Sequence, residues 1–448
     1  MKNFSLLLLI SSLLSGAFQS LSAQEAYFPP ADNEAWETAS PAALGWDAEA
    51  LAEMLGWLEE QQTRAFIILK DGRIVVEQYF GISRNTPWYW ASAGKTVTAA
   101  LVGALGNEGI IDLHSPSSIW LGEGWTSLSP DQEALITPWH QLTMTTGLDY
   151  AVDDQNCTLP GCLQFRAEAG TQWYYHNAPY TLLTHILEAA SGLELNQLTQ
   201  QKMTAIPGFS GFYAEGASGF NRVFVSNAPS KARFGLFVRH GTSWAGNDPL
   251  LSEEFFTQMI SPSQNLNPAY GYLWWINGQE SFIPPGFAVS FPGMLLPDAP
   301  ADMYAAMGMN AQILNIVPSE ELIVVRMGQE PETNIFAFTN ELWQRLNQVR
   351  APATSVAPEK PAGFRLEQNY PNPFNPATVI RFHLPEASVV NLDVYDVLGR
   401  HVQSLLNGQL APGSHSVRFD AGGLAGGFYL YKLRAGDKVL YRQMLLLK

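Results

Sequence analysis

A serine and a lysine three residues apart give the first chemical signal in this sequence. Ser92-Ala93-Gly94-Lys95 precedes residues 96–109, an apolar and alanine-rich stretch typical of a buried helix. At the start of a helix, this spacing places both side chains on one face. A serine hydroxyl is a weak nucleophile, and a nearby lysine with a lowered pKa can act as its base. The positive end of the helix disfavours a charged lysine. The free N–H groups at that end can face a developing oxyanion.

A second motif lies downstream of this pair. Taken alone, Ser92 and Lys95 would more often be a capping serine and a surface lysine. However, Tyr175-His176-Asn177 directly precedes a predicted helix over residues 180–190, closed by Ser191-Gly192. A phenol beside a lysine can act as general base or proton shuttle, and an amide can orient the lysine and a substrate carbonyl. The middle residue, His176, either points away from the nucleophile or lines the pocket.

Together the two motifs resemble the class C beta-lactamase-like serine hydrolases of the serine beta-lactamase and penicillin-binding protein superfamily. That group holds beta-lactamases, D,D-peptidases, esterases and amidases. Three supporting segments resemble family stretches in family order: residues 142–148, 170–175 and 270–275. The resemblance covers roughly residues 45–348. It implies an acyl-enzyme on Ser92, with Lys95 and Tyr175 accepting its proton. Which of these two is the general base stays open at this point.

The third motif of that family, Lys-Thr-Gly or His-x-Gly on a strand beside the nucleophile, finds its best counterpart in Ala306-Met307-Gly308. The resemblance assigns a close backbone approach to Gly308. It makes the N–H groups of Ser92 and Met309 the oxyanion contacts, with Asn177 facing the substrate. Ala306 replaces a basic residue that helps the family bind substrate carboxylates. We therefore expect a small ester or amide substrate. The alternatives are a D,D-peptidase, a beta-lactamase, or a non-catalytic penicillin-binding-like surface module.

Hydrophobic periodicity predicts the elements that must position these residues. A helix is expected over residues 47–62, a hairpin with an Asp-Gly turn at 65–69 and 74–79, strands at 272–277, 311–317 and 322–326, and a closing helix at 335–349. Strands thus lie at both ends of this region and helices between them. This order predicts an α+β fold, an antiparallel sheet flanked by helices of the beta-lactamase/transpeptidase type.

The composition changes after residue 349. A proline-containing stretch, residues 350–362, predicts an extended linker. From Gly363 to Lys448, nine Lys or Arg face six Asp or Glu, although the whole chain has a net charge of -16. Short alternating strands such as residues 389–395 predict a small all-β, immunoglobulin-like sandwich.

This tail has a resemblance of its own. Residues 366–376, Leu-Glu-Gln-Asn-Tyr-Pro-Asn-Pro-Phe-Asn-Pro, resemble the opening of type IX secretion C-terminal sorting domains, and the segments 394–396 and 427–429 also fit. The resemblance implies that residues 363–448 engage the type IX secretion machinery, which carries the protein across the outer membrane. The alternative is a carbohydrate-binding or spacer sandwich.

The N-terminus has the pattern of a secretory signal. Lys2 precedes an apolar run, residues 6–14, which is too short to span a bilayer, and Ser22-Ala23 ends the segment. We expect a signal peptide at 1–23, a hydrolase domain at 24–349, and a mature protein that is secreted or on the cell surface. The alternative is an uncleaved membrane anchor. No later segment has a transmembrane pattern.

The remaining composition narrows the possible partners. Cys157 and Cys162 predict a disulfide around a small loop, although two reduced thiols are the alternative. No cluster of His and Cys completes a metal site, and we expect no metal or cofactor. A pI near 4.9 argues against nucleic-acid binding. His140 and His185 have no partner pattern and are expected to be structural or surface residues.

Overall fold

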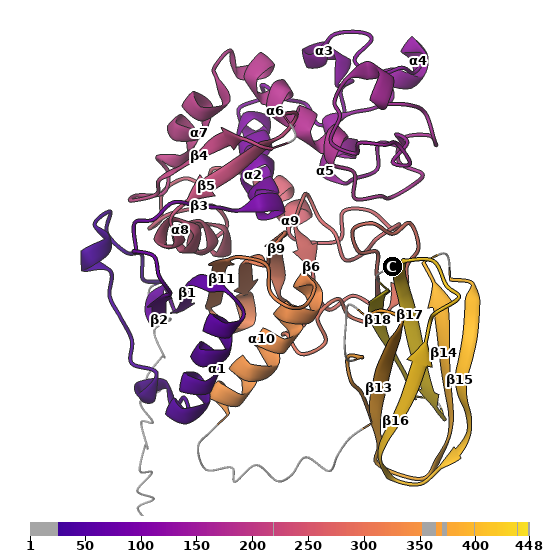
Figure 1. The fold of residues 1–448 in the computed structure, drawn as a ribbon. Helices are drawn as coiled ribbons and strands as arrows, with labels where there is room; N and C mark the ends of the chain where they lie inside the picture. The colour runs from indigo at the N-terminus through magenta and orange to yellow at the C-terminus, as the bar shows by residue number, and fades with distance from the viewer. Residues whose placement is uncertain are drawn as a thin grey trace, which may run out of the picture.

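The chain forms two units, an α+β unit up to Arg350 and an all-β unit from Phe364 onward, lying beside each other in Figure 1. The computed structural model describes residues 26–217, 219–351, 364–369, 374–397, 399–436 and 438–446. The predicted signal peptide and residues 352–362 of the predicted linker lie outside these ranges. The expected fold class is confirmed. None of the described helices is long and apolar enough to span a bilayer.

A six-stranded sheet forms the centre of the α+β unit, in the order β2-β1-β11-β10-β9-β6. All neighbouring strands run antiparallel. The strands are β1 (Thr63–Lys70), β2 (Arg73–Tyr79), β6 (Trp275–Ile276), β9 (Tyr304–Gly308), β10 (Gln312–Val317) and β11 (Leu322–Gly328). Every residue of β9, β10 and β11 is buried, because helices cover both faces of the sheet.

Helices from opposite ends of the unit cover one face. α1 (Ala48–Glu60), capped by Asp47, packs beside α10 (Ile335–Arg350), and the rings of Trp57 and Phe338 stack at 4.9 Å. On the other face lies α8 (Ala228–Arg239), where a Cβ added to Gly235 would come within 2.7 Å of the Leu314 side chain. The sheet is thus enclosed on both sides.

The chain between β2 and α8 forms a mainly helical part above the sheet (Figure 1). Its main elements are α2 (Lys95–Asn107), α6 (Asn177–Ser191), α7 (Leu195–Met203) and a small sheet of β3 (Trp88–Tyr89), β5 (Arg222–Ser226) and β4 (Gly211–Glu215). Shorter elements are α3 (Ser118–Leu121), α4 (Pro130–Glu133) and α5 (Pro138–Leu142); beyond α8 come α9 (Glu253–Met259), β7 (Ser281–Phe282) and β8 (Phe291–Pro292). α2 is buried from Lys95 to Leu105, as its apolar sequence predicted.

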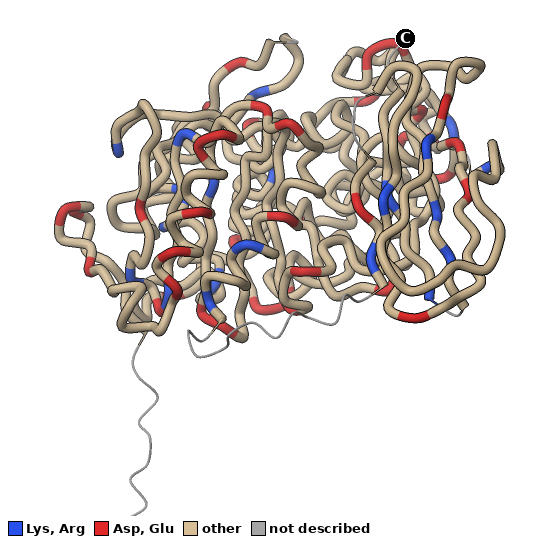
Figure 2. The backbone as a smooth tube through the Cα atoms, turned by 60° about the horizontal axis from the view of Figure 1, so that its bottom comes forward, with Lys and Arg blue, Asp and Glu red and all other residues tan. Residues whose placement is uncertain are grey.

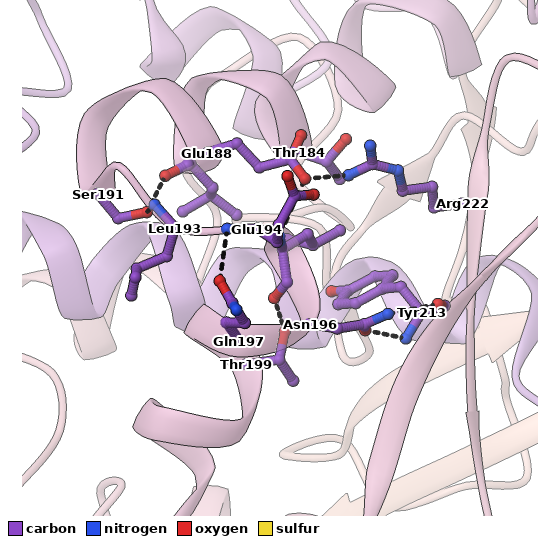
Figure 3. A network of polar contacts seen from close by, with 12 residues as sticks. Thr184, Glu188, Ser191, Leu193, Glu194, Asn196, Gln197, Thr199, Tyr213 and Arg222 are labelled. Atoms are coloured by element: carbon purple, nitrogen blue, oxygen red, sulfur yellow. Dashed lines mark hydrogen bonds and ion pairs between the residues drawn. The ribbon is translucent and has the colours of Figure 1, made fainter.

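A polar network fixes these helices relative to one another (Figure 3). Near the end of α6, the carboxylate of Glu188 accepts hydrogen bonds from the first backbone N–H of α7 at 2.9 Å and from Arg222 of β5 at 2.6 Å. The Asn196 amide pairs with the backbone of Tyr213 on β4 at 2.7 and 2.9 Å. The hydroxyl of Tyr213 then lies 2.9 Å from that of Thr98 on α2. The network therefore links α6, α7 and α2 through β4 and β5.

The segment before α1 lies along the outer edge of the sheet. Thr38 forms a parallel bridge with Ile74 of β2, and the indole of Trp36 donates to the carbonyl of Gly72 at 2.8 Å. On its other side, Arg233 of α8 donates to the carbonyl of Pro30 at 2.6 Å. The segment before α1 is thus bound to the α+β unit.

Two sheets make up the all-β unit, in the orders β12-β13-β16 and β15-β14-β17-β18. The strands are β12 (Arg365–Leu366), β13 (Ala377–Leu384), β14 (Ser388–Asp396), β15 (His401–Leu410), β16 (Gly413–Asp420), β17 (Gly427–Ala435) and β18 (Lys438–Leu446). Along β14, Val390, Leu392 and Val394 are fully buried and their neighbours are not, which is the alternation of a sandwich strand. Basic residues recur along these strands (Figure 2).

Two sequence predictions need correction. The strand expected at 272–277 is reduced to Trp275–Ile276, because Leu273 takes a left-handed φ of 61° that no strand accommodates. The helix expected from residue 180 begins at Asn177. This earlier start places Asn177 in the first turn of α6, directly after Tyr175. The small β3-β5-β4 sheet and the β7-β8 pair were not anticipated.

Candidate active site

Ser92 lies in a 3-10 turn, Ala91–Gly94, that leads directly into α2. Ala91 has a left-handed φ of 47°, a conformation that costs a non-glycine residue roughly 1 kcal/mol. The surroundings hold the turn in place. Trp90 donates its backbone N–H to Phe224 of β5 at 2.8 Å, and a Cβ added to Gly94 would lie 2.7 Å from Phe224. The serine is therefore presented by a strained turn with little room to relax.

The amine of Lys95 is held against Ser92. Its Nζ donates to Ser92 Oγ at 2.9 Å and to Asn177 Oδ1 at 3.1 Å. The side chain is buried, and the Nζ lies 4.9 Å from the ring centre of Tyr175 and 4.1 Å from that of Tyr180. Burial lowers the pKa of Lys95 to about 7. A neutral amine is thus readily populated next to the hydroxyl.

Tyr175 is the third member of this cluster. Its ring stacks on Trp275 of β6 at 5.9 Å and meets Tyr270 edge-on at 6.1 Å. Burial raises the pKa of Tyr175 well above its usual value, and a hydrogen bond with Ser92 opposes part of that shift. The phenol therefore keeps its proton at neutral pH while contacting the serine. The two motifs predicted from sequence thus meet at one point.

His176, the middle residue of the second motif, is buried at the start of α6. Burial lowers the pKa of His176 to about 4, with the Asp149 carboxylate opposing the shift. Its ring nitrogens have no hydrogen-bond partner among the described residues. The imidazole is therefore neutral at pH 7, and the charged group that acts on it is Asp149.

Strand β9 lies directly against the serine turn. A Cβ added to Gly308 would come within 2.9 Å of the Ser92 nitrogen and 2.4 Å of the Trp90 carbonyl oxygen. Only glycine allows this approach. Ala306 is two residues earlier on the strand and so lies on the same face, where it is fully buried and apolar. Met309 follows Gly308, with its side chain exposed.

A loop closed by a disulfide packs beside the start of α6. Cys157 and Cys162 are bonded, as predicted. In the same loop, the carbonyl of Gln155 accepts the backbone N–H of Ala178 at 2.9 Å. The residues that lead into the disulfide therefore contact the first turn of the helix that carries Asn177.

The two other histidines considered in the sequence lie apart from these contacts. His140 Nδ1 and the Thr137 hydroxyl, 2.9 Å apart, lie at the start of α5. Burial lowers the pKa of His140 to about 4. His185 is exposed on α6. Among the described residues, no group of three or more His, Cys, Asp or Glu is arranged to hold a metal ion.

Sequence reasoning missed Tyr180, whose ring face lies closest to the Lys95 amine. Tyr180 follows Asn177 by three residues, so both lie on one face of α6. The spacing of Asn177 and Tyr180 was visible in the sequence. It indicates a contact with Lys95 only when the helix is known to begin at Asn177.

Comparisons with known families agree with this geometry. Residues 58–223 match the family model for Beta-lactamase, and residues 368–447 match that for the Secretion system C-terminal sorting domain. The first match lies in the α+β unit and the second in the all-β unit, in the order that the sequence motifs indicated. The sorting domain implies engagement with the type IX secretion machinery and export across the outer membrane. No curated protein matches the chain.

Solved structures share the fold at low sequence identity. A putative 6-aminohexanoate-dimer hydrolase from Bacillus anthracis is similar, with TM-score 0.55, 16% identity, and coverage of 72% of this chain and 89% of that one. A putative beta-lactamase from Bacteroides dorei DSM 17855 gives TM-score 0.54, 17% identity, and coverage of 68% and 99%. A family VIII carboxylesterase gives 0.51, 15%, and coverage of 69% and 98%. These similarities establish the fold.

Proposed function

We propose that this protein is an exported serine hydrolase that cleaves small esters or amides through an acyl-enzyme on Ser92. The observation that carries the proposal is the 2.9 Å hydrogen bond between Ser92 Oγ and the buried amine of Lys95. A buried lysine with a pKa near 7 is costly to the fold, and such groups concentrate at catalytic sites. Its position in a beta-lactamase-type domain supports the same conclusion.

In this proposal, Lys95 is the general base of acylation. Neutral Lys95 takes the hydroxyl proton as Ser92 Oγ attacks the substrate carbonyl carbon. Tyr175 is protonated at neutral pH, so it gives its proton to the leaving oxygen or nitrogen and regains one from the Lys95 ammonium. Asn177 accepts a hydrogen bond from the amine and keeps it oriented. Water then attacks the acyl-enzyme and releases the acid, restoring the serine.

The oxyanion of each tetrahedral intermediate would be bound by the backbone N–H groups of Ser92 and Met309. The close contact of Gly308 with the Ser92 nitrogen supports this assignment, because it brings the end of β9 against the serine turn. Donors of this kind are aimed at charge that develops only in the transition state.

The substrate proposal rests on Ala306. A short, buried alanine offers no positive charge to a substrate carboxylate. Beta-lactams and D-Ala-D-Ala peptides both carry such a carboxylate, whereas neutral esters and amides do not. The family VIII carboxylesterase of the same fold is named as an esterase, which supports this direction. A D,D-peptidase or beta-lactamase activity is the second candidate.

Labelling with a fluorophosphonate probe and hydrolysis of p-nitrophenyl acetate test the proposed nucleophile. Wild type should react in both assays, and Ser92→Ala should lose both. Ser388→Ala in the all-β unit serves as the matched control and should behave as wild type. Equal labelling of wild type and Ser92→Ala would refute the assignment. Turnover of nitrocefin as fast as the best esters would refute the substrate proposal alone.

For export, we propose that residues 1–23 are a cleaved signal peptide and that residues 363–448 then direct the protein to the cell surface or the medium. The sorting domain supports the second step. Mass spectrometry of the exported protein should find a mature N-terminus at Gln24. An N-terminus at Met1 on the exported protein would contradict the first step.

A further inference from the structure

Arg326 of β11 is fully buried and has an unusual set of partners. Its guanidinium donates five hydrogen bonds to neutral oxygens: Thr63 Oγ1 and the carbonyls of Gln61, Gln329, Asn310 and Ala311. The ion pairs of the described residues do not include it. Burial lowers the pKa of Arg326 to about 9, so the group is charged at neutral pH. A buried charge without a counter-ion is costly unless its hydrogen bonds are satisfied.

Two of these bonds hold the turn between β9 and β10. Nη1 donates to the carbonyl of Asn310 and, at 3.2 Å, to that of Ala311. These two residues take left-handed φ values of 60° and 52°. Such conformations cost roughly 1 kcal/mol for a residue with a Cβ, so the turn needs support from its surroundings. The turn directly follows Gly308 and Met309.

The same guanidinium ties this turn to the ends of the neighbouring strands β1 and β11. Nη2 donates to the carbonyls of Gln61 at 2.7 Å and Gln329 at 3.1 Å, and Nε donates to Thr63 Oγ1 at 3.1 Å. These atoms belong to the residues just before β1, the first residue of β1, and the residue just after β11. Arg326 is thus the common donor for three chain segments that meet beside the serine turn.

A second contact holds the turn from the side of the nucleophile. The amide of Asn310 donates to the hydroxyl of Tyr89 at 2.7 Å, and Tyr89 precedes Trp90 and the serine turn. The Gln312 amide meanwhile exchanges hydrogen bonds with the backbone of Gly328 at 2.6 and 3.2 Å. The turn after Met309 is therefore held from within by Arg326 and from the serine side by Tyr89.

We propose that Arg326 is a positioning residue that fixes the β9-β10 turn so that the Met309 N–H faces the oxyanion of the acyl-enzyme reaction. The inference rests on the proposed function. Arg326 acts through the carbonyls of Asn310 and Ala311 and does not touch the substrate. Placement errors of about 1 Å at a reacting centre can cost roughly a hundredfold in rate, so a small relaxation of this turn is sufficient to matter.

The test compares Arg326→Lys with Arg345→Lys, a matched change at a half-exposed arginine of α10. A lysine keeps the charge but has no fork of donors. It cannot hydrogen-bond at once to the carbonyls of Asn310 and Ala311 in the turn and to those of Gln61 and Gln329. We expect the kcat for p-nitrophenyl acetate to fall about tenfold, with KM within about twofold, because an oxyanion contact acts in the transition state. Arg345→Lys should leave both constants unchanged. A folded Arg326→Lys with wild-type kcat would overturn the proposal.

Tyr89→Phe keeps the proposal testable if Arg326→Lys does not fold. It removes one hydroxyl contact with Asn310 and leaves the core intact. We expect kcat to fall about threefold with an unchanged melting temperature. Wild-type kcat in Tyr89→Phe, together with loss of folding in Arg326→Lys, would assign Arg326 a purely structural role. Ser92→Ala is run in the same assay: if it retains activity, both proposals fall, and if it is inactive, the result for Arg326 stands by itself.

Discussion

Lys95 and Lys231 are both buried lysines, but their amines have different surroundings. Lys95 contacts Ser92 and Asn177, whereas Lys231 Nζ has no hydrogen-bond partner among the described residues and lies 4.8 Å from the ring of Trp90. Burial lowers the pKa of both amines. The first lysine is thus arranged to exchange a proton with a hydroxyl, and the second mainly reduces stability.

Activity should depend on pH through Lys95. Below its pKa of about 7 the amine is protonated and cannot accept the serine proton. We expect kcat/KM to rise about tenfold per pH unit on the acid side and to level off above pH 7. The measurement is hydrolysis of a non-ionising ester between about pH 5 and 9, with the Ser92→Ala rate subtracted at each pH. A flat profile below pH 7 would exclude Lys95 as the base.

Lys231→Met should stabilise the protein. Burial lowers the pKa of Lys231 in the folded state, so the folded protein binds this proton less tightly than the unfolded chain, and wild-type stability falls as pH drops below the lysine's unfolded pKa. Methionine fits a similar volume without that cost. We expect a higher melting temperature at pH 7 and a smaller gain near pH 10. Lys70→Met, at a half-exposed site, is the control. Equal or lower melting temperature in Lys231→Met would mean that the amine has a compensating partner.

At the scale of elements, the approach of β9 to the serine turn is the contact that assembles the site. Gly308→Ala would push a methyl group against the backbone atoms of Trp90 and Ser92. Backbone cannot step aside as a side chain can, so we expect kcat to fall roughly a hundredfold, similar to loss of an oxyanion donor. Gly56→Ala on α1, where an added Cβ meets nothing within 4 Å, should retain full activity. Steady-state kinetics on both variants test this prediction. Comparable kcat values for Gly308→Ala and Gly56→Ala would contradict the assignment of the Met309 N–H as an oxyanion donor.

Helices and strands with a clear local pattern could be predicted from the sequence, and short or irregular ones could not. The β1-β2 hairpin was predictable because Asp71 and Gly72 form its turn with left-handed φ values of 51° and 77°. β10, β11 and α10 follow their hydrophobic patterns to within a residue or two. The strand predicted around Trp275 was too long, because most residues of its apolar run are buried in a loop and not in a strand. The short β3-β5-β4 sheet has no pattern of sufficient length.

The candidate site was also predictable only in part, because only some of its residues lie in local motifs. Ser92, Lys95, Tyr175 and Asn177 occur in local motifs that survive in sequence order. The contacts of Arg326 join residues far apart in the chain, and a buried arginine in a run of apolar residues gives no sign of which carbonyls it binds. Long-range contacts of this kind follow from the topology of the sheet, which the local pattern does not determine.

At the scale of the whole molecule, the two units keep separate hydrophobic cores. Where they meet, Phe287 and Phe428 lie 6.4 Å apart, beside a cavity of about 490 Å³ lined by residues of both units, including Phe336 and Tyr441. A close-packed shared core would leave no such space. We therefore expect each unit to fold without the other.

Deletion of residues 351–448 should therefore preserve catalysis and abolish export. We expect kcat/KM within about twofold of wild type, because the site lies wholly in the α+β unit, while the truncated protein stays in the periplasm. Kinetics on the purified protein and fractionation of cells test the two parts. The full-length Ser92→Ala protein is the control, since it should be exported although inactive. Loss of activity in a folded truncation would show that the all-β unit belongs to the active unit.

The segment before α1 has a consequence for association between molecules. The bridge between Thr38 and Ile74, with the bond from Ala39 N–H to the Ile74 carbonyl at 2.8 Å, occupies backbone groups that β2 would otherwise present at the edge of the sheet. An open edge is a template for pairing with another chain. A chain beginning at Asp47, the cap of α1, should therefore form oligomers or aggregates by light scattering, whereas one beginning at residue 26 should remain monodisperse. By covering the edge of β2, the segment before α1 prevents that strand from pairing with another chain.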